Sequence, residues 1–336
     1  AAVTRCCRSV HRLRMPAEFC GCVYAKGSPA YAQRAATYAT THTYAGERAL
    51  QPAAVAEPRD VDDIVRALHY VRDNRARGRQ PQHVVARSGG HQYSGYSGGG
   101  DDTLVLDMRH FDHKVIDARA ATARVGAGVR LHQLAEAFAR AGVTVPHGEC
   151  PLVAIGGHAQ SGGYGHIARA FGMHLDYVAA FTIVLADGSV RRVPRPPMSR
   201  AAGTADWASA PSPAGAPQCY PSTLDERLFY SVLGGGPGSF GVVTEYEYDV
   251  IVDTQWPDSW GMQNAYVYRR ALLDVLLRTY QRWVSSPPPP DVDLFATVVS
   301  AREWYMPSDG MVLVELAHRT GMRHVPTTTA AATAYR

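Results

Sequence analysis

The sequence predicts an α+β fold in two parts, a larger mixed unit over residues 49–252 and a smaller α+β unit over residues 253–336. Three observations carry this expectation. Apolar residues make up 46% of the 336-residue chain and charged residues 19%, which allows packed cores in two domains. Helical periodicity and β-rich runs alternate through the larger unit. From about Asp253 the composition of the sequence changes: two tryptophans, an amphipathic segment and a proline run follow.

The larger unit is expected to begin with a strand or an extended segment, followed by a helix. Residues 53–56 form an apolar run, and Asp60 is a suitable N-cap for the helix that follows. The apolar residues of that helix share one face: Val61, Ile64, Val65, Leu68 and Val71. Short runs within 83–87, 103–117 and 121–128, separated by Asp and Gly, are expected to be strands, and residues 129–142 return to helical spacing.

A β-hairpin is predicted over residues 177–193, because two β-rich runs flank Asp187-Gly188, a dipeptide suited to a tight turn with positive φ. Residues 194–223 are rich in Pro, Ala, Ser and Gly without apolar periodicity, so we expect a surface insertion there. The remaining expected elements are a short helix at 224–233, a strand at 242–252, a helix near 269–284 and a strand after the prolines at 287–290.

Charge and hydropathy exclude several classes of protein. The net charge of +4 comes without a long Lys/Arg run, which argues against a nucleic-acid groove and a polybasic membrane anchor. No stretch approaches the ~20 apolar residues of a membrane span, and the first residues lack the apolar core of a secretory signal. The sequence leaves localisation, secretion and oligomeric state open.

Residues 1–48 are expected to be a partly disordered leader and chain entry, or to include a mispredicted start upstream of Met15. Four of the six cysteines lie in this segment. Neither Cys6-Cys7 nor Cys20-x-Cys22 has the spacing of zinc ligands, so no metal site is predicted. His132, His147 and His166 also lack metal-ligand spacing and are interpreted as surface or packing residues.

Two glycine-rich segments carry the candidate chemistry. Residues 87–95 (RSGGHQYSG) form a turn after a buried strand, and such a turn exposes backbone N–H groups that suit a pyrophosphate. An ordinary strand-ending turn is the alternative. Residues 146–165 surround Cys150 and two histidines with glycines, which indicates backbone packed against a flat or charged ligand. Cys150 could equally be a small buried hydrophobic residue.

Two further patterns match known motifs only as strings. Residues 95–99 satisfy G-x-S-x-G, but a strand follows where a serine hydrolase requires a helix, so hydrolysis by Ser97 is a remote alternative. Residues 236–241 satisfy G-x-G-x-x-G, yet they precede a strand, which argues against a nicotinamide Rossmann site.

Five motifs together resemble a known family. RSGGHQYSGYS, VGAGVRLHQL, PHGECPLVAIGGHAQSGGYGH, IVLADG and LFYSVLGGGPGSFGVVTE occur in the order seen in FAD-linked oxidases of the berberine bridge enzyme-like group. That group belongs to the vanillyl-alcohol oxidase and p-cresol methylhydroxylase (PCMH) superfamily. The match spans residues 50–252 and implies a two-subdomain PCMH-type FAD-binding domain, followed here by a truncated α+β substrate domain.

The resemblance implies FAD held by two covalent bonds, from His91 to the 8α-methyl and from Cys150 to C6 of the flavin. The loop from Arg87 would hold the pyrophosphate, and Val153 occupies the position that controls oxygen access in relatives. The full set of implied cofactor-binding residues is Arg87, Ser88, Gly89, Gly90, His91, Gln92, Tyr93, Ser94, Cys150, Val153, Gly156, Gly157, His158, Ser161, Gly162, Gly163, Tyr164, Gly165, Gly241, Val242 and Val243.

The implied activity is oxidation of an alcohol, carbohydrate or alkaloid-type small molecule, with molecular oxygen as the acceptor and hydrogen peroxide as a product. Relatives continue beyond the end of this chain, and the C-terminal segment that returns to the flavin in them is not present. No catalytic base is therefore assigned. A truncated, catalytically inactive flavin-binding paralogue or gene fragment is the alternative.

Overall fold

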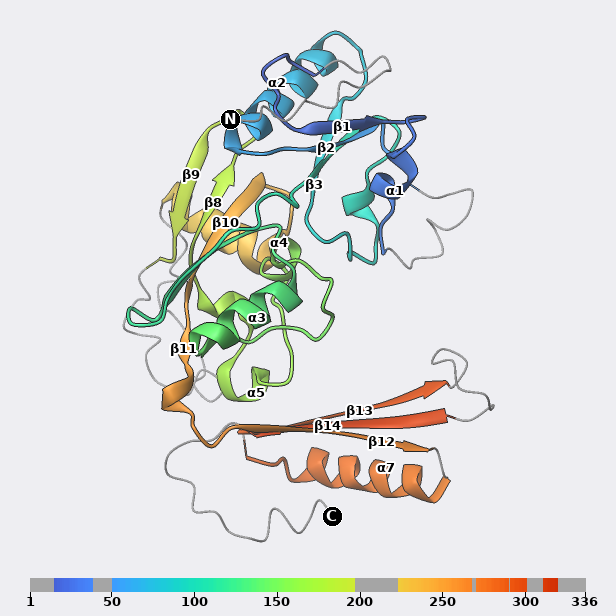
Figure 1. Ribbon diagram of the computed structural model, residues 1–336, viewed down its shortest axis with the longest axis vertical. Coiled ribbons are helices and arrows are strands. Elements are labelled where there is room, and N and C mark those ends of the chain that lie inside the picture. Colours follow the sequence, from blue (N-terminus) through green and yellow to red (C-terminus); the bar gives the residue numbers. More distant parts are fainter. Residues whose placement is uncertain are drawn as a thin grey trace, which may run out of the picture.

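The computed structural model describes residues 15–38, 50–196, 223–267, 270–289, 291–300 and 311–319. Helices and strands are mixed throughout, as the sequence predicts, and Figure 1 shows three main sheets along the molecule. Most of the expected insertion at 194–223 and part of the expected leader lie outside the described residues. Within these described ranges, no helix is long and apolar enough to cross a membrane.

The first sheet has the strand order β1-β2-β4-β3. Strands β2, β3 and β4 are parallel, and β1 pairs with β2 in antiparallel fashion. Its elements are β1 (Cys22–Ala25), α1 (Tyr31–Ala35), β2 (Ala54–Glu57), α2 (Val61–Ala76), β3 (His83–Arg87) and β4 (Thr103–Asp107). The part of the expected leader that is described therefore contributes a strand, and Phe19 joins the core beneath α2.

Helix α2 begins where the sequence predicts. The Asp60 carboxylate accepts a hydrogen bond from the N–H of Asp63 at 2.8 Å, which satisfies one of the free donors of the first turn. Ile64 and Val71 of the predicted apolar face are buried against the sheet, while the other three residues of that face are partly buried. The helix connects two parallel strands, as expected for a βαβ unit.

The second sheet is antiparallel, with the order β5-β6-β10-β8-β9. Its strands are β5 (Lys114–Asp117), β6 (Thr122–Gly126), β8 (Val178–Val184), β9 (Val190–Pro194) and β10 (Val242–Asp249). The predicted hairpin is β8–β9, and its turn has positive φ at Gly188 (89°) but not at Asp187. The Asp187 carboxylate instead accepts a hydrogen bond from the N–H of Ser189 at 2.8 Å.

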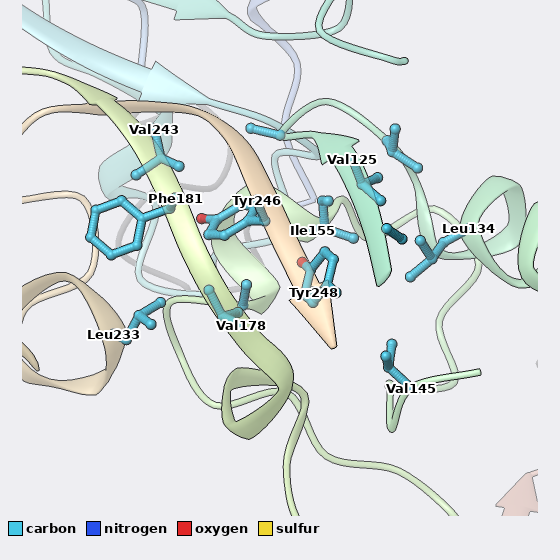
Figure 2. Close-up of a cluster of buried hydrophobic side chains, with 14 of the residues drawn as sticks. Val125, Leu134, Val145, Ile155, Val178, Phe181, Leu233, Val243, Tyr246 and Tyr248 are labelled. Atoms are coloured by element: carbon cyan, nitrogen blue, oxygen red, sulfur yellow. The ribbon is translucent and has the colours of Figure 1, made fainter. Parts of the chain in front are cut away.

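Short helices and a two-stranded pair complete the larger unit. They are α3 (Leu131–Ala141), β7 (Val143–Thr144), α4 (Ile155–His158), α5 (Ala168–Phe171), α6 (Leu224–Tyr230) and β11 (Ile251–Val252), which pairs with β7. Helix α3 ends at Gly142, which has the left-handed conformation that glycine tolerates. Figure 2 shows the core that these elements share with the second sheet, where Tyr246 and Tyr248 of β10 lie close to Ile155 of α4.

The third sheet has the order β12-β14-β13 and is antiparallel. Its elements are β12 (Trp260–Val267), α7 (Arg270–Ser285), β13 (Val292–Ser300) and β14 (Met311–Arg319). Helix α7 lies along the face of this sheet that is turned away from α5 (Figure 1). The Arg169 guanidinium of α5 donates hydrogen bonds to the carbonyl oxygens of Pro288 and Val292 at 2.9 and 2.7 Å, which connects the two parts of the chain.

Candidate functional site

The loop after β3 presents a row of backbone donors. In the part of the chain that the structure describes, no acceptor pairs with the amide N–H groups of residues 88–94. Gly90 has a φ of 72°, which a residue with a Cβ adopts at a cost. Consecutive free N–H groups on a glycine turn form an anion-binding concavity. The geometry therefore fits the pyrophosphate role implied by the sequence.

Arg87 supports this loop from behind. Its guanidinium is buried and pairs with Asp107 at 2.9 Å, and it also donates to the carbonyl oxygens of Arg34 and Ala35. The guanidinium of Arg109, together with that of Arg87, holds the pKa of Asp107 below its usual range despite its burial. The side chain of Arg87 is thus engaged within the protein, and we interpret it as the anchor of the loop rather than as a phosphate ligand.

His91 lies on the same loop with its ring fixed. The imidazole stacks on Tyr38, with ring centroids 4.0 Å apart and an interplanar angle of 13°. Its Nε2 atom is buried and has no hydrogen-bond partner within the described residues. Burial, and then the positive charge of Arg130, hold the pKa of His91 below its usual range. The ring is therefore neutral at neutral pH, and a neutral imidazole nitrogen is the form that can bond to carbon.

Cys150 is a free, exposed cysteine on a loop that packs against the start of α3. Pro151 and Val153 accept backbone hydrogen bonds at 3.1 and 2.8 Å from the N–H groups of His132 and Leu131. Val153 is partly buried and packs against the core. The thiol therefore projects from a well-anchored turn, which excludes the alternative that Cys150 is a buried hydrophobic residue.

The His91 and Cys150 segments touch each other through glycines. A Cβ at position 89 would lie 2.7 Å from the backbone nitrogen of Ala154, and one at position 156 would overlap with the Ser88 hydroxyl. The contacting residues are 65 and 68 positions apart in the sequence, yet they leave no space for a side chain between them. The structure thus brings the two predicted attachment loops together.

The glycine run after α4 is held from inside by Gln160, which the sequence did not single out. Its amide nitrogen donates to the carbonyl oxygen of Gly156 at 2.7 Å, and its amide oxygen accepts from the N–H of Gly238 at 2.9 Å. The Tyr246 hydroxyl donates to the same Gly156 oxygen at 2.8 Å. A long polar residue within a run of small ones was the available signal. Gln160 therefore joins the glycine run at Gly156 to the loop at Gly238, and Tyr246 joins the same run to β10.

Part of the segment 156–165 is exposed to solvent. A Cβ at Gly157 would meet no atom within 4 Å, and Tyr164 is 76% exposed. No acceptor among the described residues pairs with the N–H groups of residues 162–165, and Gly162 and Gly163 both have positive φ. The hydroxyl of Ser161 donates to the carbonyl oxygen of Gly157 at 2.6 Å. Gly157 and Tyr164 therefore mark the uncovered part of this segment, where the edge of a planar ligand could lie, while Gly162 and Gly163 are buried against neighbouring side chains.

The remaining predicted residues are placed differently. His158 points toward Gly148, with its Nε2 atom 3.0 Å from the Gly148 nitrogen. Val242 and Val243 at the start of β10 are buried in the two cores, and a Cβ at Gly241 would lie 2.5 Å from the carbonyl oxygen of Val184. The side chains of Val242 and Val243 are therefore not available to a ligand.

On the first loop, the Gln92 side chain closes a local turn by accepting from the N–H of Ser97 at 2.8 Å, and Tyr93 is 66% exposed. Ser94 is partly buried. Ser97 itself lies in a short 3-10 turn at Tyr96–Gly98, and its hydroxyl has no hydrogen-bond partner within the described residues. A nucleophilic serine needs a base within hydrogen-bond reach, so the structure does not support the hydrolase alternative.

The residues present fit FAD. Free backbone donors suit its pyrophosphate, the open face at Gly157 suits a flat ring system, and a neutral imidazole and an exposed thiol lie on adjoining loops. Among the described residues, no three His, Cys, Asp or Glu side chains converge as a metal site would require.

Comparisons with known proteins agree with this geometry. A family described as FAD binding domain matches residues 52–194. Glucooligosaccharide oxidase of Sarocladium strictum is 30% identical over 242 residues, which are 70% of this chain and 42% of the relative. Berberine bridge enzyme-like 12 of Arabidopsis thaliana is 33% identical over 175 residues, which are 49% of this chain and 27% of the relative.

A solved structure, that of Physcomitrella patens BBE-like 1, has a TM-score of 0.67 and 26% identity over 95% of this chain and 57% of its own. The chain spans less than half the length of the curated relatives it matches. The order of motifs, the FAD-binding domain and the shared fold lead to one conclusion: the chain belongs to the PCMH-type FAD-linked oxidases of the berberine bridge enzyme-like group.

Proposed function

We propose that this protein is an FAD-dependent oxidoreductase that holds its flavin by two covalent bonds, through His91 and Cys150. One observation carries the proposal: the loop with free amide groups that bears His91 adjoins the loop that bears Cys150. Two attachment points on adjoining loops could fix one edge of a flat ring and leave its reactive face open. The glycines that follow Cys150 would contact the cofactor through their backbone atoms.

Each residue group has a separate part in this proposal. Residues 88–94 would donate hydrogen bonds to the pyrophosphate, and Arg87 would hold that loop through Asp107. Tyr38 keeps the His91 ring in one plane, while burial keeps it neutral. When bound, FAD supplies hydride acceptance and transfer of the two electrons to oxygen, which is the chemistry of the cofactor rather than of the protein.

The proposed substrate is a small molecule with an oxidisable alcohol carbon, and we favour a carbohydrate over an alkaloid-type compound. The support is the 30% identity to a glucooligosaccharide oxidase. Oxygen is the proposed acceptor, because Val153 has a small side chain at the position that controls oxygen access in the family that the sequence resembles. The substrate would lose a hydride and a proton, and oxygen would take up two electrons and two protons to give hydrogen peroxide.

The test of flavin attachment is the absorbance of acid-precipitated protein. We expect wild type, His91→Ala and Cys150→Ala each to keep flavin in the precipitate, and the double variant to lose it. Cys20→Ala is the matched control, because Cys20 is also an exposed cysteine but lies outside the site. Flavin that stays in the precipitate of the double variant would refute this attachment.

The test of turnover is peroxide formation with a panel of oligosaccharides and alcohols. Steady peroxide production by the flavin-loaded chain would support the oxidase and exclude the inactive paralogue. A yellow, covalently loaded protein that reduces no oxygen with any member of the panel would favour a flavin-binding protein without turnover.

A further inference from the structure

His158 fills the space between two glycine positions. Its Nε2 atom accepts a hydrogen bond from the N–H of Gly148 at 3.0 Å. A Cβ at Gly148 would lie 2.9 Å from the His158 ring, and a Cβ at Gly163 would lie 2.7 Å from Nε2. Both glycines are thus required by the imidazole that lies between them, and the ring joins the Cys150 loop to the glycine run.

A second histidine binds the same loop from deeper inside. His174 is fully buried, and its Nδ1 lies 2.8 Å from the carbonyl oxygen of Pro146, while its Nε2 lies 2.9 Å from the Tyr248 hydroxyl. The rings of His158 and His174 meet edge to face, with centroids 5.2 Å apart. Residues 146 and 148 are therefore each held by one histidine.

These partners fix where the protons are. A carbonyl oxygen can only accept, so His174 carries its proton on Nδ1 and accepts the Tyr248 hydroxyl proton at Nε2. The N–H of Gly148 can only donate, so Nε2 of His158 must be unprotonated. If His158 were protonated, its Nε2–H would face the N–H of Gly148, and two donors cannot form a hydrogen bond, so this contact would break.

The surroundings favour the neutral form of both rings. Burial, and then the neighbouring His147, lower the pKa of His158 to about 4. Burial, and then His158, lower the pKa of His174 to about 3. The titratable groups that face the pair are His147, whose Nδ1 lies 2.8 Å from the Gly148 carbonyl oxygen, and Tyr248, whose pKa is raised by burial.

We propose that His158 is a positioning residue: in its neutral form it fixes the 146–150 loop and so holds Cys150 in place for attachment, and acid releases the loop. On the other side of Cys150, the N–H and Nδ1 of His132 lie 3.1 and 2.8 Å from the carbonyl oxygen of Pro151. Cys150 is thereby held between two backbone anchors, of which only the one at His158 is lost when the histidine is protonated. The side chain of the adjacent Glu149 also pairs with His166 at 3.1 Å, and this contact weakens in acid in wild type and in the His158 variants alike. The inference rests on the proposed function, since it concerns the bond formed at Cys150.

The first readout is hydrogen–deuterium exchange at the Gly148 amide in the purified full chain, corrected for intrinsic rates, between about pH 7 and about pH 4. In wild type we expect protection that falls toward the acidic end. His158→Leu removes the acceptor and should lower protection about tenfold at neutral pH. His158→Gln keeps an acceptor oxygen without a titrating group at position 158, so its protection should fall much less with acid than that of wild type.

The second readout is the mass of the flavin adduct on the Cys150 peptide, compared with that on the His91 peptide. His158→Leu should lose most of the Cys150 adduct and keep the His91 adduct, and His158→Gln should restore it. His83→Ala is the control. His83 is an exposed histidine at the start of β3 that pairs with Asp102, away from the Cys150 loop.

Two results would overturn the inference. One is a Gly148 amide in His158→Leu that is as protected as in wild type. The other is an acid-induced loss of protection in His158→Gln as large as that in wild type. If His158→Leu does not fold, the pH profiles of wild type and His158→Gln still decide it. Absence of flavin from both wild-type peptides would contradict the proposed function instead, because the exchange at Gly148 is measured without reference to flavin.

Discussion

Gly156 and Gly157 are neighbours in the sequence with opposite surroundings. A Cβ at position 156 would overlap with the Ser88 hydroxyl and lie 2.8 Å from the carbonyl oxygen of Ala127, whereas position 157 faces open space. The first glycine is therefore a packing requirement between two loops. The second is required only if a ligand lies against it.

This contrast gives a prediction for alanine at each position. Gly156→Ala should lower the free energy of unfolding by about 1–3 kcal/mol through overpacking, and should reduce flavin content as well. Gly157→Ala should leave the free energy of unfolding unchanged and lower flavin content alone. Urea denaturation and the flavin-to-protein absorbance ratio measure the two effects. Equal destabilisation by both variants would contradict the assignment of the open face.

At the scale of elements, helix α2 follows from local chemistry. Asp60 caps it, and its apolar spacing buries Ile64 and Val71 against the first sheet. The very short elements α4, α5 and β7 were not predicted. Segments of two to four residues contain too few positions for a periodicity, so tertiary contacts decide their conformation.

The cap of α2 can be tested by substitution. Asp60→Ala leaves the N–H of Asp63 without its acceptor and should cost about 1 kcal/mol of unfolding free energy. Asp60→Asn keeps a capping oxygen and should cost little. Thermal or urea denaturation of the two variants gives the comparison, and an equal loss for both would mean that the charge at the helix N-terminus matters more than the hydrogen bond.

At the scale of the whole molecule, two neutral histidines, the partly buried His158 and the fully buried His174, couple stability to pH. The folded-state pKa values of His158 and His174, about 4 and about 3, lie below the unfolded value. The unfolded chain therefore binds more protons as pH falls below about 6.5, and stability must fall with it. The stabilisation is fully present above that pH and is lost progressively toward the folded-state pKa values.

The predicted consequence is a difference in slope between two proteins. Between about pH 6.5 and about pH 4, His158→Gln should lose less stability than wild type, by up to about 1.4 kcal/mol per pH unit, because one titrating group is gone. Denaturation midpoints at several pH values measure this slope. Because both proteins have the same carboxylates, their contribution to the pH dependence cancels when the two stability curves are subtracted. Parallel curves would show that His158 is protonated to the same extent in both states.

The sequence by itself determined the α+β content, helix α2 with its cap, the β8–β9 hairpin, the positions along the chain of β2 to β6 and of β10, and the loops that bear His91 and Cys150. These features depend on periodicity, turn chemistry and motif order, all of which are local or sequential. Boundaries of the two domains and individual ligand roles remain predictions.

Only the tertiary structure showed that Arg87 is turned inward, that Gln160 joins two loops, and that His158 binds the Cys150 loop. The reason is that each of these side chains is satisfied by a partner elsewhere in the chain, with 78 positions between Gln160 and Gly238 and 10 between His158 and Gly148. A hydrogen bond depends on where the fold places the donor and acceptor, and no local pattern records which polar group will meet which.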